Sequence, residues 1–300
     1  MRALIYRSYG GPEVLEVAEV PEPHAGPGQI RIAVKAASVN AMDWKLRSGM
    51  LSGEKALEAP AYLGFDASGV VDEVGEGVAG VAVGDEVFGK GDNTQAEYAV
   101  LDAWVPKAPQ LDWAVAGAVG VTGETSERVL RLLGVQPGET LFIDGGAGGV
   151  GAVATQFAVA RGIRVIASAS QDNQDYLREI GATPVLYGQG LVNRVRAVPG
   201  DPVTAVLDAA GKTPIEDLVA LVPEPSRVVS IANWGAASAG ARVTGGSQDS
   251  QPMKAMAETA ELLEQNKLVV KVQTFPLDRA AEAHRISESG HVRGKLVLLP

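Results

Sequence analysis

The sequence predicts an α/β protein with two domains, a barrel of antiparallel strands and a doubly wound parallel sheet. Before about residue 112, short strand-like runs alternate with Gly and Pro turn signals, which is typical of a barrel. After that point, strand-like and helix-like segments alternate, which is typical of a parallel sheet covered by helices on both faces. A chain of 300 residues with 46% hydrophobic content is long enough for two cores.

The elements follow from hydrophobic period and turn residues. In the barrel we expect strands at 2–6, 30–37, 68–74 and 86–89. In the parallel sheet we expect strands at 140–143, 164–167, 185–187, 203–208 and 227–232, with helices at 124–133, 150–160, 172–180 and 214–221. A helix at 251–266 precedes strands at 269–275 and 295–299, which flank a helix at 277–288. We therefore expect one domain at 1–113 and 268–300 and the other at 114–267.

The most specific motif is a glycine-rich turn at residues 141–151, Leu-Phe-Ile-Asp-Gly-Gly-Ala-Gly-Gly-Val-Gly. Gly146, Gly148 and Gly151 fit the spacing of a dinucleotide-binding turn, in which the first glycine turns the chain, the second admits a pyrophosphate and the third lets the helix pack. The helix that follows would direct its first N–H groups, including those of Gly149 and Val150, at the phosphates. With the strand at 164–167, the turn completes a βαβ unit of a Rossmann domain.

The end of the second strand indicates which dinucleotide binds. A domain that prefers NAD places Asp or Glu there to hold the ribose 2′-OH. Here the strand ends in Ser168 and Ser170, and no carboxylate precedes Asp172. Because an uncharged strand end tolerates a 2′-phosphate, the sequence predicts NADPH. Arg194 and Arg293 are the basic residues that folding could bring to that phosphate.

Composition excludes several classes of site and partner. The chain has no cysteine and only His24, His284 and His291, so thiolate nucleophiles and histidine-rich metal sites are not expected. A net charge of −10 argues against a nucleic-acid partner. No apolar run approaches the roughly 20 residues of a membrane span, and no signal-peptide pattern opens the chain. We expect a soluble cytoplasmic protein with His284 and His291 at its surface.

A series of segments resembles one known family. The segments are 1–4 with 10–15, 39–49, 64–75, 84–89, 96–98, the glycine turn and 293–297. In this order they resemble the medium-chain dehydrogenase/reductase superfamily, and within it the zinc-free quinone oxidoreductase branch. The resemblance covers nearly the whole chain and implies a GroES-like barrel beside the Rossmann domain. Zinc-dependent relatives carry a cysteine near the start of 40–43 and a His-Glu pair at Phe65-Asp66, so no metal is expected here.

The resemblance also implies roles for single residues. It places Asn40 and Asp43 beside the nicotinamide and substrate, although both also suit an Asx turn that opens a helix at 42–49. We expect Asp43 to orient or cap, since an exposed carboxylate near its usual pKa is a poor acid at neutral pH. The predicted cofactor contacts outside the glycine turn and strand end are Thr122, Asn173, Tyr187, Ile231 and Lys295. Tyr187 and Lys295 also suit purely structural roles.

The acceptor pocket and the reaction follow from these residues. Trp44, Met50 and Trp234 are candidates for apolar walls, or equally for core between domains. The sequence predicts an NADPH-dependent, zinc-independent reductase that transfers hydride to quinones or α,β-unsaturated carbonyls. A dedicated enoyl or polyketide tailoring reductase and a non-catalytic NADPH-binding sensor or scaffold remain alternatives. The resemblance also implies a homodimer, formed at a sheet edge near 227–231.

Overall fold

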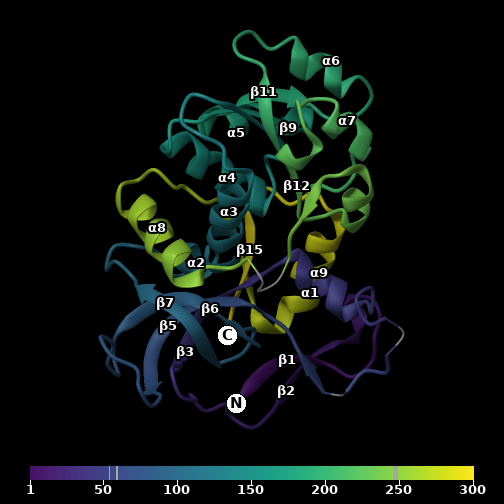
Figure 1. Ribbon diagram of the computed structural model, residues 1–300. Coiled ribbons are helices and arrows are strands. Elements are labelled where there is room, and N and C mark those ends of the chain that lie inside the picture. Colours follow the sequence, from purple (N-terminus) through teal and green to yellow (C-terminus); the bar gives the residue numbers. More distant parts are fainter. Residues whose placement is uncertain (54, 59, 246–248) are drawn as a thin grey trace. The chain divides into compact units, whose positions relative to one another are not determined.

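The computed structural model describes residues 1–53, 55–58, 60–245 and 249–300, and the chain divides into two compact units (Figure 1). The first unit contains Met1–Val121, Pro252–Ala260 and Val270–Pro300, and the second contains Thr122–Gln251 and Glu261–Val269. The first boundary follows residue 121 rather than 113. The reason is that α2 (Trp113–Gly117) packs on the sheet of the first unit, where the Ser68 hydroxyl donates to the carbonyl of Trp113 at 2.7 Å.

The first unit is built from strands. They are β1 (Arg2–Tyr6), β2 (Leu15–Glu19), β3 (Ile30–Val39), β4 (Ala61–Tyr62), β5 (Asp66–Val74), β6 (Glu86–Asp92), β7 (Tyr98–Pro106), β14 (Val272–Pro276) and β15 (Lys295–Leu299). One sheet has the order β14-β15-β3-β5-β6-β7, and β3 also pairs with β7, so β3, β5, β6 and β7 close into a barrel. Register shifts in β3 and β6 supply the bends that closure requires. Another sheet has the order β2-β1-β4.

Apolar side chains fill the barrel and the space beside it. Ile30, Ile32 and Val34 alternate along β3 and are buried in the barrel core. A second cluster, which includes Phe275 and Leu296, lies under the helices of this unit. Those helices are α1 (Ala41–Arg47), α9 (Ala280–Ser289), η1 (Pro12–Val14) and η5 (Leu277–Arg279). Helices α1 and α9 lie side by side (Figure 1).

The second unit is a parallel sheet. Its strands are β8 (Thr140–Asp144), β9 (Arg164–Ala169), β10 (Thr183–Leu186), β11 (Val203–Asp208), β12 (Val228–Ser230) and β13 (Arg242–Val243), in the order β10-β9-β8-β11-β12-β13. Its helices are α4 (Gly149–Ala160), α5 (Gln174–Glu179), α6 (Leu191–Arg196), α7 (Ile215–Val219), η2 (Gln171–Asn173), η3 (Pro225–Arg227) and η4 (Trp234–Ala239), while α3 (Gly120–Leu133) and α8 (Pro252–Glu264) are divided by the unit boundaries. The order reverses between β8 and β11, as in a Rossmann domain.

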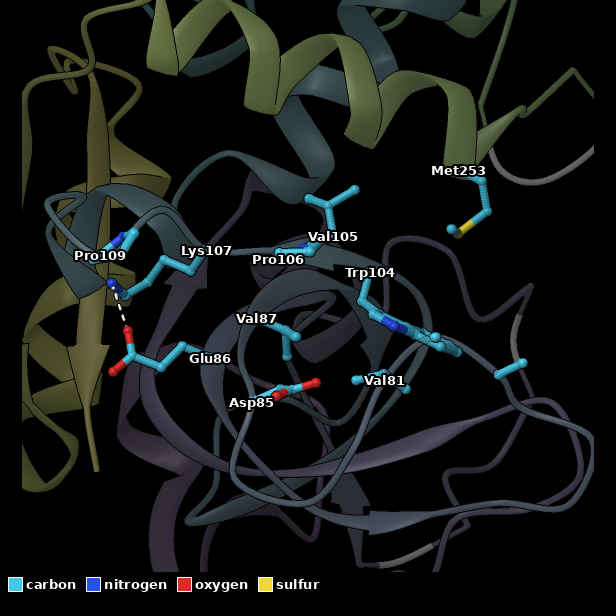
Figure 2. A pocket seen from close by; sticks show the side chains of 12 residues that line it. Val81, Asp85, Glu86, Val87, Trp104, Val105, Pro106, Lys107, Pro109 and Met253 are labelled. Atoms are coloured by element: carbon cyan, nitrogen blue, oxygen red, sulfur yellow. Dashed lines mark ion pairs between the residues drawn. The ribbon is translucent and has the colours of Figure 1, made fainter.

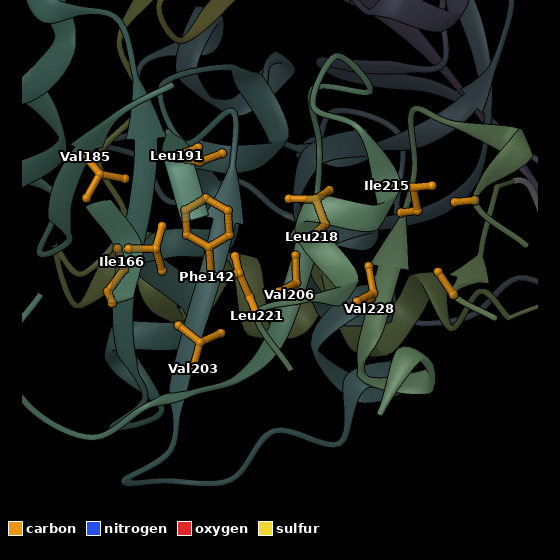
Figure 3. Close-up of a cluster of buried hydrophobic side chains, with 13 residues drawn as sticks. Phe142, Ile166, Val185, Leu191, Val203, Val206, Ile215, Leu218, Leu221 and Val228 are labelled. Carbon is orange, nitrogen blue, oxygen red and sulfur yellow. The ribbon is translucent and has the colours of Figure 1, made fainter. Parts of the chain in front are cut away.

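One face of this sheet packs on helices α6 and α7. Figure 3 shows Phe142 of β8 among side chains of the neighbouring strands, with Leu191 of α6 and Leu218 of α7 in the same cluster. These residues are buried, and the strands are apolar on both faces because helices cover both. The predicted combination of a GroES-like barrel and a doubly wound parallel sheet is therefore confirmed.

Some elements differ from the sequence expectation. Strands β2, β4, β7 and β13 and helices α2 and α6 were not predicted, and β4 and β13 are too short to carry a periodic signal. The expected sheet edge near 227–231 was wrong, because β13 pairs with β12 through Arg242 and Val243. Within the part of the chain that the structure describes, no helix combines the length and apolar character that crossing a bilayer requires.

Candidate functional site

The glycine-rich turn joins β8 to α4 in the second unit. Gly145 has a φ of +85°, a backbone region that favours glycine, so the sharp turn is at this residue. The sequence spacing assigned that turn to Gly146, one position too late. A Cβ on Gly146 would lie 2.6 Å from the Cβ of Ala167, so Gly146 instead lets the turn pack against β9.

The other two glycines of the motif have separate roles. A Cβ on Gly151 would collide with the carbonyl oxygen of Gly145, so this glycine lets α4 start against the turn. At Gly148 the nearest atom to an added Cβ would be the Gly145 carbonyl oxygen at 3.5 Å, an ordinary contact, so the chain itself does not require glycine there. Gly148 is the N-cap of the 12-residue helix α4 and no side chain caps that end. A phosphate fits there, on the partly exposed backbone of Gly148, Gly149 and Val150.

The Ser168 side chain is directed at the glycine turn and not at the place predicted for the ribose phosphate. Its side chain is 1% exposed, donates to Asp144 Oδ1 at 2.5 Å and accepts from the Gly145 N–H at 3.0 Å. The Ser168 carbonyl also accepts from Gly146 N at 2.9 Å. Ser168 therefore fixes the glycine turn from below, and its prediction as a direct contact of the ribose phosphate is corrected.

The other residues predicted near the end of β9 lie in the segments that follow β9 and β10. Asn173 Nδ2 donates to Ser170 Oγ at 3.0 Å, so these two predicted contacts are neighbours just after β9. Tyr187 follows β10 and is 55% exposed. The guanidinium of Arg194 donates to the carbonyls of residues 186–189 at 2.8–3.1 Å. Arg194 thus stabilises that loop, and its hydrogen bonds are already committed to it.

A network of hydrogen bonds fixes the carboxyl ends of β11 and β12. Asp208 accepts from Ala210 N at 3.2 Å, from Gly211 N at 2.7 Å and from the Ser230 hydroxyl at 2.7 Å. Directly opposite it in the β8–β11 register is Asp144, whose pKa burial raises above the usual range. Sequence reasoning missed both carboxyl groups, although an Asp at the end of each strand was a visible signal.

Three further predicted residues belong to the second unit. Ile231 N donates to Asp208 O at 3.0 Å, so the chain after β12 is tied to β11. Trp234 opens η4 and is 52% exposed, with its ring over Gly245. Thr122 is 1% exposed, and its carbonyl accepts from the Ser126 hydroxyl at 2.7 Å.

A group of polar side chains, which we call the polar cluster, lies in the first unit. It consists of Ser38, Asn40, Asp43, Asp66 and Lys295, each no more than 7% exposed. Ser38 comes from β3, Asp66 begins β5 and Lys295 begins β15, while Asn40 and Asp43 open α1. The structure therefore brings together three of the predicted site residues, and it adds Ser38 and Asp66, which were not predicted as site residues.

The amide of Asn40 is oriented by its neighbours. Lys295 Nζ donates to Asn40 Oδ1 at 2.5 Å, which identifies the oxygen side of the amide. Asn40 Nδ2 lies 3.0 Å from Ser38 Oγ and 2.9 Å from Asp66 Oδ1. Those two oxygens are only 2.5 Å apart, because Ser38 donates to Asp66. Asn40 Nδ2 therefore donates to two oxygens that are themselves joined by a hydrogen bond.

The oxygen and the nitrogen of the Asn40 amide are therefore both bonded within the polar cluster. Asn40 is the most exposed member of the polar cluster, at 7%, whereas Asp43 and Asp66 are at 0%. The arrangement presents one oriented amide donor, as the chemistry of a polarised carbonyl requires.

Asp43 is buried, which corrects the expectation of an exposed carboxylate. Its oxygens accept from Asn40 N at 2.6 Å and from Gly64 N at 2.8 Å, so it fixes the start of α1. Burial raises the pKa of Asp43 to about 7, and the charge of Asp66 acts in the same direction. Burial also lowers the pKa of Lys295, against the attraction of Asp66 and Asp43.

The histidines and the proposed wall residues are placed as follows. His284 is fully buried, so its prediction as a surface residue was wrong, whereas His291 is exposed. His284 Nε2 lies 3.1 Å from Gln95 Oε1, and burial lowers the pKa of His284 to about 3. Trp44 is partly buried on α1, and Met50 beyond that helix is 62% exposed.

A cavity of about 630 Å³ lies elsewhere in the first unit (Figure 2). Apolar side chains, among them Val87, Trp104 and Met253, line it, and Lys107 pairs with Glu86 at 2.9 Å on one side. The cavity shares no residue with the polar cluster or the glycine turn, so we assign it no part in the chemistry. Among the described residues, no three His, Cys, Asp or Glu side chains are arranged to hold a metal ion.

Known families match most of the chain. Residues 26–129 match the family described as alcohol dehydrogenase GroES-like domain, and residues 180–298 match the family described as zinc-binding dehydrogenase. The quinone oxidoreductase of Pseudomonas aeruginosa is 30% identical over an alignment of 322 residues, gaps included, and the alignment covers 98% of each chain. The spectinabilin polyketide synthase system protein NorB of Streptomyces orinoci is 31% identical over 312 residues, which cover 96% of this chain and 14% of that protein.

Solved structures have the same fold. The quinone oxidoreductase of Escherichia coli complexed with NADPH has a TM-score of 0.87 and 25% identity, with both chains covered completely. The quinone oxidoreductase of Coxiella burnetii has a TM-score of 0.86 and 30% identity, covering 100% of this chain and 99% of the other.

Proposed function

Because this chain belongs to the zinc-free quinone oxidoreductase branch of the medium-chain dehydrogenase/reductase superfamily, we propose that it reduces quinones or α,β-unsaturated carbonyls with NADPH. The observation that carries the proposal is the glycine turn, where no side chain caps the start of α4 and the N-cap Gly148 places none there. An anionic pyrophosphate matches the unpaired N–H groups of that helix end. The absence of an acidic residue at the end of β9 favours NADPH over NADH.

The chain offers a binding residue for each part of the cofactor. Gly146, Gly148 and Gly151 would let the pyrophosphate approach the turn, and the backbone N–H groups of Gly149 and Val150 at the start of α4 would donate to it. Ser170 and Asn173 would lie at the 2′-phosphate, and Tyr187 at the adenosine. Ile231 and Thr122 remain predicted contacts nearer the nicotinamide end. When bound, NADPH supplies a hydride from C4 of its nicotinamide.

The polar cluster would act on the acceptor. When hydride reaches a quinone or the β-carbon of an enone, negative charge develops on the carbonyl oxygen. An N–H of Asn40 would donate to that oxygen in place of its bond to Ser38. Lys295 donates to Asn40 Oδ1, which polarises the amide and strengthens its N–H groups as donors. Asn40 thus supplies electrophilic assistance without a metal.

Asp43 acts through Asn40 in this proposal. It holds the backbone N–H of Asn40 and is therefore a positioning residue. Its pKa of about 7 means that it gains or loses a proton near neutrality, which changes the charge around Lys295. We expect the rate to depend on pH in that range. Trp44, Met50 and Trp234 remain candidates for the apolar walls of the acceptor site.

Turnover with defined acceptors tests the proposal. Purified protein treated with a chelator is mixed with NADPH and a panel of quinones and enones, and loss of reduced nicotinamide is followed. We expect turnover that survives chelation and is faster with NADPH than with NADH. Absence of turnover with every acceptor, or its loss on chelation, would contradict the proposal.

A tailoring reductase of a biosynthetic assembly line is the second candidate. The similarity to a segment of the Streptomyces orinoci polyketide synthase protein favours it. A strong preference for one enoyl thioester over simple quinones would select this reading. A non-catalytic sensor or scaffold would bind NADPH without transferring hydride to any acceptor, and the oriented Asn40 amide argues against it.

We also propose a homodimer in the cytoplasm. The sheet of the second unit ends at β13 on one side, and a second copy would pair at a sheet edge. A light-scattering mass equal to one 31.1 kDa chain would contradict the dimer. The cysteine-free, acidic composition suits a cytoplasmic protein, and cell fractionation tests that location.

A further inference from the structure

Two buried carboxyl groups lie at the strand ends where a nucleotide would bind. Asp144 ends β8 and Asp208 ends β11, and these are the strands between which the sheet order reverses. The two residues are direct partners in the strand register and are 1% and 0% exposed. In doubly wound sheets the ligand binds outside the carboxyl ends at this reversal. The pair therefore lies at the base of the nucleotide crevice.

The two groups have unequal surroundings. Asp208 accepts three hydrogen bonds, from Ala210 N, Gly211 N and the Ser230 hydroxyl. Asp144 accepts one, from Ser168 Oγ to its Oδ1 at 2.5 Å. Its second oxygen, Oδ2, is buried with no partner at hydrogen-bond distance among the described residues. Donors stabilise a carboxylate, so Asp144 is the member of the pair that takes a proton more readily.

The charges around Asp144 act in the same direction. Burial raises its pKa first, and the negative charge of Asp208 on the adjacent strand raises it further. The hydroxyls of Ser168 on β9 and of Thr213, which precedes α7, oppose this effect but carry no charge. Asp208 is the charged group whose field acts on Asp144.

We propose that this carboxylate pair takes up one proton when NADPH binds, and that Asp144 holds it. The inference rests on the proposed function, because it requires NADPH in the crevice. The pyrophosphate would bring more negative charge to a site that already holds two carboxyl groups, and exclusion of water strengthens the repulsion. The proton comes from solvent and converts the Asp144 carboxylate to the neutral acid, which removes one of the opposing charges.

Protonation is compatible with the glycine turn as built. Ser168 donates to Oδ1 of Asp144 and accepts from Gly145 N, so it fixes the turn through that oxygen. The proton would go to Oδ2, which accepts no hydrogen bond among the described residues, and the Thr213 hydroxyl that acts on Asp144 can accept as well as donate. The turn therefore keeps its geometry in both protonation states, and only the charge at the base of the crevice changes.

Proton uptake and affinity are linked. If binding takes up a proton, the dissociation constant for NADPH rises with pH, by about tenfold per unit where uptake reaches one proton. Reciprocally, NADPH increases the protonated fraction of Asp144. The 2′-phosphate of NADPH titrates with a pKa of about 6, so uptake must be compared between variants that share this contribution.

Calorimetric titration of the whole chain with NADPH tests the proposal. Titrations at one pH in buffers of different ionisation enthalpy count the protons taken up, and a pH series gives the slope of the dissociation constant. Asp144→Asn keeps the size of the side chain and removes the titrating group. Glu216→Gln, at an exposed position of α7, removes one charge from the same unit and is the matched control.

We expect the wild type and E216Q to take up more protons than D144N and to lose affinity more steeply as pH rises. Equal uptake by the wild type and D144N would overturn the inference while leaving NADPH binding intact. Absence of NADPH binding by the wild type would instead overturn the proposed function. If D144N does not fold, Ser168→Ala takes its place, because it removes a hydrogen-bond donor from the Asp144 carboxylate. The fall in NADPH affinity should then occur at higher pH than in the wild type, and an unchanged pH profile of the affinity would contradict the proposal.

Discussion

Replacement of Asn40 by Ala would remove the oriented donor of the polar cluster. In the structure the amide oxygen accepts from Lys295 at 2.5 Å, and Nδ2 donates to Ser38 and Asp66, which fixes the orientation of the amide. We expect Asn40→Ala to lower kcat and kcat/KM by about 10²–10³-fold, the usual effect of removing one donor from a developing oxyanion. In energy this is about 3–4 kcal/mol.

The same change also affects stability, so the two effects must be separated. Loss of the amide leaves Lys295 and Asp66 with fewer partners inside the protein, which costs about 1–3 kcal/mol. Ser38→Ala is the matched control, because it removes hydrogen bonds within the polar cluster but leaves the Asn40 amide and its bonds to Lys295 and Asp66 in place. We expect Ser38→Ala to lower stability and to change kcat by less than about tenfold.

Steady-state kinetics with one quinone and one enone, together with urea unfolding of each variant, provide the measurements. A donor that acts mainly in the transition state lowers kcat and kcat/KM together, whereas a donor that only binds substrate raises KM. If Asn40→Ala keeps kcat/KM within about threefold of the wild type, the assignment of Asn40 as the acceptor-side donor is wrong.

Three further predictions concern single residues. Asp43→Asn should flatten the pH dependence of the free energy of unfolding. A carboxyl group with a raised pKa stabilises the fold at acid pH and loses that contribution, up to about 4 kcal/mol, as pH rises from about 4 to about 7. Urea unfolding at several pH values checks this, and parallel curves of wild type and variant would contradict it. His284→Gln should resist acid better than the wild type. The buried, neutral His284 has a pKa lowered to about 3, so its contribution to the stability of the wild type is lost as pH falls below about 6.5. Acid titration followed by circular dichroism checks this, and an equal unfolding midpoint in both proteins would contradict it. Gly148→Val should weaken NADPH binding at least about tenfold, because a branched side chain would stand where the phosphate approaches the start of α4. It should cost at most about 1 kcal/mol of stability, since an added Cβ makes only an ordinary contact within the chain; fluorescence titration with unchanged affinity would argue against a phosphate there.

The fold was largely predictable because its signals are local. Strands β11 and β15 match the expected ranges at both ends, since each is a short apolar run bounded by polar or turn residues. The glycine spacing located the turn correctly but assigned the sharp bend to Gly146 instead of Gly145. That distinction depends on backbone angles and on the position of β9, which spacing does not contain.

The candidate site was predictable only in part because its contacts join distant segments. The sequence named Asn40, Asp43 and Lys295 from a resemblance, but it placed Asp43 at the surface and Lys295 at the cofactor. In the folded chain, Lys295 lies 255 positions from Asn40 and bonds to its amide. Burial in the folded chain raises the pKa of Asp43, and the sequence around Asp43 contains no pattern that predicts this burial.

The central claim is that this chain binds NADPH and passes its hydride to a polarised acceptor. Rapid mixing of the protein–NADPH complex with a quinone or an enone, with NADPH carrying hydrogen or deuterium at C4 of the nicotinamide, tests it most directly. We predict oxidation of the bound cofactor that depends on the acceptor and is slower with deuterium. A complex that forms but stays reduced with every acceptor would contradict the claim.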